Sequence, residues 1–146
     1  MIDPKTIMYE EGRRQALDLQ DRSEGMTGTE LYAEDTCIPD FLAAKAKQNM
    51  LDRPVGFVCK SSAGRVVRLL QVYDSDIYTQ EPEELPAQWG FVWSHDPAKA
   101  LPFFPLSTSP YMQGDCCTEN GITYRSTIDN NVWAPSAYED GWEVAV

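Results

Sequence analysis

The middle of the chain alternates apolar and polar residues with a period of two, which is the spacing of a half-buried β-strand. The alternation predicts strands over 55–60 and 65–73, joined by the turn sequence Ser61-Ser62-Ala63-Gly64. A loop with two prolines follows, and a third extended segment is expected over 89–93. Trp89 and Trp93 in this segment are expected in a core or at a subunit interface.

A second strand pair is predicted over 114–119 and 122–128, with Asn120-Gly121 between the strands. Both central positions of a type I′ turn need positive φ, and Asn-Gly is the pair that tolerates this best. The segment 96–110 holds four prolines and is expected to be an extended connector with Phe103 and Phe104 packed against the rest of the protein.

The N-terminal part shows weaker helical patterns. A helix is expected over 3–20, with Asp3 as cap and Pro4 in the first turn. Its apolar stripe is thin, so the helix is expected to pack on another subunit or to remain frayed. The stripe consists of Ile7, Met8, Leu17 and Leu19. Residues 23–29 are predicted to be a flexible linker and 31–38 a short extended segment.

A further helix is predicted over 41–51, capped by Asp40, with Leu42, Ala46 and Met50 on one face. Together these patterns predict a mainly β protein made of two small tandem antiparallel β-hairpin modules and an N-terminal helical or extended arm. The expected organisation is an arm and linker over 1–30, a first β-module over 31–95, a Pro-rich connector over 96–110 and a second β-module over 111–146.

The two predicted modules resemble each other, which suggests an internal duplication. Each reads glycine, strand, glycine-containing turn, strand, proline loop and tryptophan. The matched residues are Gly56 with Gly114, Gly64 with Gly121, Arg68 with Arg125, Pro82 with Pro135 and Trp89 with Trp142. Chance similarity between two short hairpins is the alternative.

The formal charge of −11 excludes some classes of partner. A protein that binds nucleic acid needs a positive surface to displace counterions from phosphate, and anionic lipid repels a negative one. Neutral sugars or a complementary protein surface remain. No apolar run approaches the ~20 residues that a membrane span needs. The polar start gives no sign of a signal peptide, so the protein is expected to be made in the cytoplasm.

The residue types of a catalytic or metal site occur, but their spacing favours other roles. Glu81, Glu83 and Glu84 are expected to be solvated loop acids, and His95 a surface residue. Asp74 and Asp76 lack the glycine and closing glutamate of a calcium loop. We therefore expect no catalytic residues, metal or cofactor. The four cysteines, Cys37, Cys59, Cys116 and Cys117, are expected to be buried, reduced thiols.

The C-terminal third carries a spaced motif of aromatic, glycine and polar residues. It reads Tyr111-x-x-Gly114-Asp115, then Asn120-Gly121-x-x-Tyr124-Arg125-Ser126, then Pro135, then Gly141-Trp142-Glu143. This motif resembles the small chitin-binding modules of carbohydrate-binding families 5 and 12. Residues 129–138 are also similar to versions of this module in bacteriophage and prophage structural proteins.

The resemblance implies a short twisted antiparallel sheet that binds polysaccharide through exposed aromatic rings, without catalysis. Trp133, Tyr138 and Trp142 are then the ring candidates, and Asp129 and Asn131 could bond sugar hydroxyls. The same rings could instead form the module's core, which is favoured for Trp142, and residues 129–131 could simply form a turn, which is favoured there.

The resemblance also implies a setting. We expect a virion or tail component, assembled in the host cytoplasm, that recognises a chitin-like or bacterial cell-surface glycan. The alternative is a purely structural virion or tail component that uses the same modules for subunit contacts. The arm and the many aromatic residues favour a homo-oligomer that contacts other virion or tail proteins.

Overall fold

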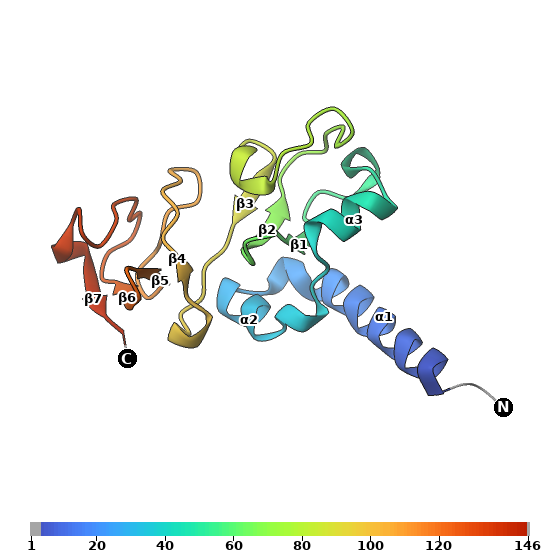
Figure 1. Cartoon of the computed structure of the whole chain (residues 1–146), viewed down its shortest axis with the longest axis horizontal. Helices are drawn as coiled ribbons and strands as arrows, with labels where there is room; N and C mark the ends of the chain where they lie inside the picture. Colours follow the sequence, from blue (N-terminus) through green and yellow to red (C-terminus); the bar gives the residue numbers. More distant parts are fainter. Residues whose placement is uncertain (1–3, 146) are drawn as a thin grey trace.

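A computed structural model describes the backbone of residues 4–145 and the side chains from Arg13 onward. Within these residues, seven short strands form two sheets, preceded by a helical N-terminal region (Figure 1). The mainly β expectation agrees with these two sheets. The helices are α1 (Pro4–Arg22), α2 (Gly28–Ala33) and α3 (Phe41–Lys47). Short 3-10 turns η1 to η6 cover Ser23–Gly25, Asp35–Cys37, Met50–Asp52, Pro82–Glu84, Pro97–Lys99 and Glu139–Gly141.

The N-terminal helix forms where it was expected, but its last turn packs on its own chain. Leu19 is fully buried, and the side-chain amide of Gln20 bonds both the N–H and the C=O of Val58, at 3.0 and 2.7 Å. The expected packing on another subunit is therefore wrong for this turn. Leu17 is exposed. The predicted cap Asp3 and the side chains of Ile7 and Met8 lie outside the part of the chain that the structure describes. No described helix is long and apolar enough to cross a bilayer.

The flexible linker over 23–29 and the extended segment over 31–38 are both wrong, because this region is helical. Thr27 Oγ1 accepts the Glu30 N–H at 3.1 Å, and the Glu30 carboxylate accepts the Thr27 N–H at 3.2 Å. This reciprocal capping box satisfies two N–H groups that otherwise lack partners and fixes the start of α2. The helix then buries Leu31 and Tyr32.

The next helix is shorter than predicted and faces the core with other residues. It ends at Lys47, because Gln48 is extended, and Met50 lies in the separate turn η3. Phe41 and Ala44 are buried while Leu42 is exposed, so the predicted apolar face is wrong. Asp40 precedes the helix, but its side chain makes no capping hydrogen bond.

The first sheet is an antiparallel meander in the order β1-β2-β3. Its strands are β1 (Val58–Lys60), β2 (Val66–Leu69) and β3 (Trp89–Phe91). Cys59 pairs with Val67, and Leu69 pairs with Trp89. Gly64 has φ +86° in the turn between the first two strands. The predicted strand pair is confirmed, with shorter strands.

The second sheet has the order β4-β5-β6-β7. Its strands are β4 (Leu101–Pro102), β5 (Cys116–Glu119), β6 (Ile122–Ser126) and β7 (Trp142–Val144). The Asn-Gly hairpin is confirmed: Glu119 pairs with Ile122, and Asn120 and Gly121 have φ of +52° and +79°. β4 comes from the proline-rich connector and pairs parallel to β5.

The two sheets share one hydrophobic core. Trp93 stacks on Tyr111 with ring centroids 4.3 Å apart, and Tyr111 meets Trp142 edge to face at 5.4 Å. Phe103 and Phe104 of the connector pack against the same cluster, as expected. Trp89 and Trp93 are both buried in it, so they are core residues.

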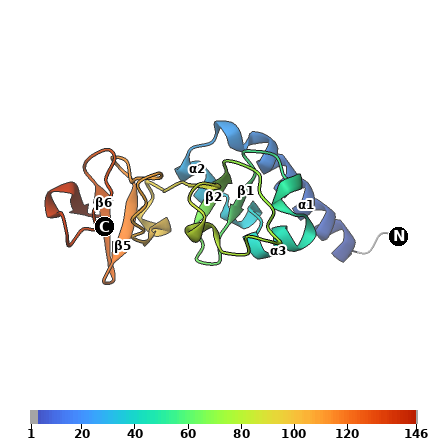
Figure 2. The same ribbon diagram turned by 90° about the horizontal axis from the view of Figure 1, so that it is seen from above.

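The molecule is elongated. α1 and α3 lie at one end, and the loop and strand that close the second sheet lie at the other (Figures 1 and 2). Surfaces at the two ends are therefore separate, and one ligand of ordinary size cannot touch both.

Candidate functional site

The loop between β6 and β7 carries four of the predicted site residues. Trp133 is 49% exposed and Tyr138 is 39% exposed, and Asp129, four residues before Trp133, is also exposed. Asn131 of the same loop is fully buried, and Trp142, which begins β7, is only 7% exposed. The surface that a ligand can reach is thus formed by Trp133, Tyr138 and Asp129.

Asn131 organises this loop from inside. Its side-chain N–H groups donate to Ser126 Oγ at 3.1 Å and to the Gly141 carbonyl at 2.9 Å. Its Oδ1 accepts the Trp133 N–H at 3.3 Å, and its backbone pairs with Tyr111. A contact between Asn131 and sugar hydroxyls is therefore wrong, because its side chain is buried and already bonded within the protein.

Trp142 is a core residue that also supports Trp133. Its indole N–H donates to the Trp133 carbonyl oxygen at 2.7 Å, and its ring meets Phe103 edge to face. The main chain of Trp133 is thereby held on both sides, by Asn131 at the N–H and by Trp142 at the C=O. The sequence favoured a core role for Trp142, and its burial agrees with that role.

The two exposed rings do not form a flat platform. Their centroids are 5.5 Å apart and their planes meet at 80°. Edge-to-face packing is the arrangement that the quadrupoles of two aromatic rings prefer. The rings form a corner, in which a ligand can stack on one ring and touch the other from the side.

Three exposed acids lie close to the two ring residues in the sequence. The Asp129 carboxylate accepts the Gln113 N–H at 3.0 Å. Glu139 and Asp140 are exposed directly after Tyr138. The sequence reasoning did not assign these two acids to the site. Their position next to a predicted ring residue was the available signal.

His95 is paired with an acid rather than with a nucleophile. Its Nε2 lies 3.3 Å from the Asp115 carboxylate, which is only 7% exposed. Burial raises the pKa of Asp115 above its usual range, and the N–H of Met112 and the charge of His95 partly oppose this. The nearby Cys116 thiol contacts the His95 carbonyl oxygen at 3.6 Å. Burial raises the pKa of this thiol, which makes it a weaker nucleophile at neutral pH.

Other acidic residues considered as catalytic or metal-binding candidates make contacts within the protein. The side-chain amide of Asn49 donates to Asp74 and Asp76, at 2.9 and 3.2 Å, so neither acid faces a vacant cation site. Among the described side chains, those of residues 13–145, no group of three or more His, Cys, Asp and Glu could hold a metal ion. Glu83 is an exception to the expected solvated acid run, since its side chain is largely buried 4.0 Å from Arg65.

All four cysteines lie in the described region as free thiols, as expected. Cys59, Cys116 and Cys117 are buried, and Cys37 is partly exposed. Burial raises the pKa of Cys117 to about 12. These thiols therefore act as small core residues.

We expect Asn131→Ala to destabilise the protein by about 1–3 kcal/mol, because the Gly141 carbonyl and the Trp133 N–H lose a buried partner. Urea unfolding followed by tryptophan fluorescence measures this change. Asn130→Ala is a poor control, because Asn130 has φ +54°, a backbone conformation that asparagine tolerates better than alanine. Asp129→Ala, at an exposed position, is the better reference. Equal stability of Asn131→Ala and wild type would contradict the organising role of this amide.

No protein-family model matches the chain, and neither a curated protein nor a solved structure is significantly similar to it.

Proposed function

We propose that the protein is a non-enzymatic glycan-binding protein whose binding surface is the corner formed by Trp133 and Tyr138. One observation carries this proposal: the main chain of Trp133 is fixed by Asn131 and Trp142, while half of its side chain faces solvent. A large ring held rigidly at the surface loses little conformational entropy when it contacts a ligand. Aromatic faces also suit the apolar face of a pyranose ring.

The corner geometry narrows the class of glycan. Two rings at 80° cannot both stack on one flat polysaccharide surface. A single sugar unit or a chain end can stack on Trp133 and meet the edge of Tyr138. The exposed acids Glu139 and Asp140 and the net charge of −11 favour a neutral sugar over an acidic one.

The proposed setting is a phage-type virion or tail component that recognises a cell-surface glycan. This setting rests on the resemblance of residues 129–138 to versions of the module in bacteriophage and prophage structural proteins. A homo-oligomer would raise the avidity of a surface that holds one or two sugar units per chain.

We also propose that the two sheets arose by duplication of one three-stranded meander. Gly56 and Gly114 both have positive φ, at +95° and +97°. The N–H of each donates to the carbonyl oxygen of the residue that pairs, across the sheet, with the tryptophan of the same half. These acceptors are Leu69 and Ser126, which pair with Trp89 and Trp142. The pairing of Cys59 with Val67 corresponds to that of Cys117 with Tyr124.

The loops before the two tryptophans support the same duplication. Each loop contains a turn in which two successive backbone N–H groups donate to the same carbonyl oxygen. That carbonyl belongs to Asp74 in the first loop and to Ala134 in the second. Each turn ends on an exposed tyrosine, Tyr78 or Tyr138. This correspondence replaces the matching of Pro82 with Pro135, since Pro82 instead begins the later turn η4.

A purely structural role is the second candidate, and a specific surface favours it. The loop after β2 exposes several apolar side chains: Leu70, Val72, Ile77 and Tyr78 are 50%, 45%, 69% and 53% exposed. Exposed apolar side chains in one segment are a feature of protein contacts. Under this alternative the two related loops hold neighbouring subunits together.

Trp133→Ala separates the two candidate functions. We expect it to weaken glycan binding by about 1–3 kcal/mol, which is roughly a 5- to 150-fold loss, since a central ring contact is removed. A glycan array identifies the ligand, and titration calorimetry then compares the affinities. Stability should change little, because the side chain is half exposed.

Tyr78→Ala is the control, because Tyr78 is an exposed aromatic residue whose place in the first loop corresponds to that of Tyr138, the other ring of the corner. It should leave glycan affinity unchanged. If Trp133→Ala leaves glycan binding unchanged but lowers oligomer mass in light scattering, the glycan proposal fails and the structural one stands.

A further inference from the structure

Residues of α1 and α3 line a groove. These two helices lie at the end of the molecule opposite β6 (Figures 1 and 2). Its volume is about 930 Å³. The floor is apolar and is formed by Leu17 of α1, Ala43 of α3 and Phe57, among others. Leu17 is 58% exposed, so the groove is open to solvent at this residue.

The charge of this groove is opposite to that of the whole protein. Arg13, Lys47 and Arg53 line it, and none of its described lining residues is acidic. The chain has 12 basic and 23 acidic residues, so a lining with basic residues alone is unusual for this surface. The groove therefore attracts acidic groups that most of the remaining surface repels.

Arg53 is the fixed member of the basic set. Its guanidinium lies 4.5 Å from the centroid of the Phe57 ring, and Nη2 donates to the Ala44 carbonyl at 2.8 Å. Its Nε has no hydrogen-bond partner, and burial lowers the pKa of the guanidinium below its usual value. A carboxylate bound nearby would offset this cost of desolvation.

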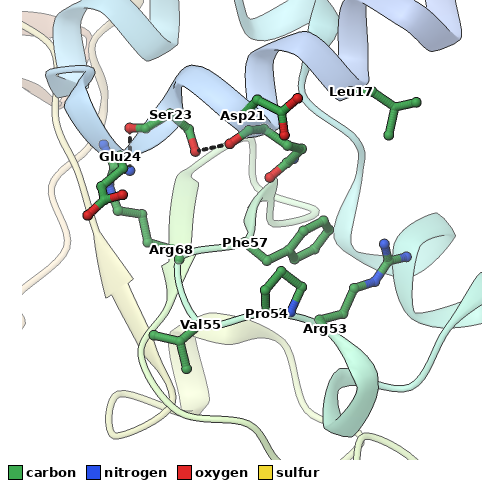
Figure 3. A pocket seen from close by; sticks show the side chains of 11 residues that line it. Leu17, Asp21, Ser23, Glu24, Arg53, Pro54, Val55, Phe57 and Arg68 are labelled. Atoms are coloured by element: carbon green, nitrogen blue, oxygen red, sulfur yellow. Dashed lines mark hydrogen bonds between the residues drawn. The ribbon is translucent and has the colours of Figure 1, made fainter.

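The groove continues into a second hollow of about 760 Å³, shown in Figure 3. Leu17, Arg53 and Phe57 line both spaces. Arg68 also lines the second hollow, where its guanidinium donates to the Ser23 and Met26 carbonyls. Asp21 and Glu24 also line this second hollow, so only the first groove has a lining whose charged residues are all basic.

We propose that this groove docks a short acidic segment of a partner protein. Apolar side chains of the segment lie on Leu17, Ala43 and Phe57, and its carboxylates face Arg13 and Lys47. The inference is independent of glycan binding and makes the protein an adaptor, with one end for a protein partner and the other for a sugar.

The charge and shape of the protein disfavour other anionic partners. Nucleic acid and anionic membranes present many phosphates, which a surface of net charge −11 repels beyond the groove. A fatty acid needs an enclosed apolar cavity, whereas Leu17 leaves this groove open. A peptide with a few acids meets the basic side chains and avoids the acidic remainder.

The experiment is a selection of random 12-residue peptides from a display library on the full-length protein. The enriched peptides should combine Asp or Glu with large apolar residues. Synthetic fluorescein-labelled copies then give dissociation constants by anisotropy, and affinity should fall as NaCl rises from 0.05 to 0.5 M because salt screens the charges. Vesicles containing phosphatidylserine and a single-stranded oligonucleotide are tested in parallel.

Matched variants test the location. Arg13→Glu should lower peptide affinity about fivefold, and Arg13→Glu/Lys47→Glu about 25-fold, since each reversal replaces attraction by repulsion. Arg14→Glu makes the same charge change on the next residue of α1, which does not line the groove, and should change affinity less than twofold. Trp133→Ala should have no effect.

Three outcomes would overturn the proposal. The first is a selection that enriches no acidic peptide. The second is equal loss of affinity in Arg13→Glu and Arg14→Glu, which would indicate a general charge effect. The third is binding of the vesicles or the oligonucleotide that depends on Arg13, which would assign the groove to a different class of partner.

Discussion

Replacing Trp89 by alanine is expected to destabilise the protein by about 3–5 kcal/mol, the range for removing a large aromatic side chain from a core. Trp89 is fully buried and meets both Phe41 and Tyr73 edge to face, with centroids 5.7 and 6.2 Å apart. Its indole N–H donates to the Tyr73 hydroxyl at 3.0 Å, so the substitution also leaves a buried hydroxyl short of a partner.

The expected loss is a large share of the about 5–15 kcal/mol that stabilises a typical domain. Urea unfolding followed by circular dichroism measures it, because one of the fluorescent tryptophans is removed. Trp133→Ala deletes the same side chain from an exposed position and is expected to change stability by less than about 1 kcal/mol. Similar losses in the two variants would mean that Trp89 is not the centre of the core.

Gly28→Ala is expected to destabilise the protein by about 2–3 kcal/mol, although it adds a single methyl group. A Cβ at this position would lie 2.1 Å from the carbonyl oxygen of Trp93 and 3.0 Å from its nitrogen. The obstacle is backbone, which cannot rotate away as a side chain can. Relief requires α2 to move away from the segment that follows β3.

Such a movement would disturb contacts that α2 makes with the first sheet. The Tyr32 hydroxyl donates to the Val92 carbonyl at 2.9 Å and accepts the Val66 N–H at 3.1 Å. Gly25→Ala is the control, because nothing lies within 4 Å of its Cβ position. Thermal unfolding of both variants tests the prediction, and a Gly28→Ala variant as stable as Gly25→Ala would refute the close approach.

Local chemistry explains which parts of the fold could be predicted. The Asn120-Gly121 hairpin follows from two adjacent residues that tolerate positive φ, so no distant contact is needed. The period-two strands were also found, because alternation is a local signal. The start of α2 depends on Thr27 and Glu30, which are only three residues apart. This capping-box spacing is therefore a local signal, visible in the sequence, for a helix at a segment that was expected to be a flexible linker.

Long-range contacts explain the rest. Phe41 faces inward in place of Leu42 because α3 docks on the first sheet, and its own periodicity does not fix that rotation. The parallel pairing of β4 with β5 joins residues of the connector to a strand 16 residues further along the chain, at Leu101 and Cys117. In the candidate site, the exposed rings could be named from the sequence, but not the burial of Asn131 or the angle between the rings.

The aromatic stack that joins the two sheets limits where the chain can be divided into fragments that fold on their own. The Tyr111 ring stacks on Trp93 of the first half and on Phe103 of the connector. Strand β4, also from the connector, forms the edge of the second sheet. A fragment that begins at residue 111 would expose the rings that these neighbours cover. The C-terminal third therefore cannot be transplanted as a self-sufficient tag in the way that a detachable domain can. If duplication produced the two halves, their fusion into one core ended their separate exchange between proteins, and from then on they could only evolve together.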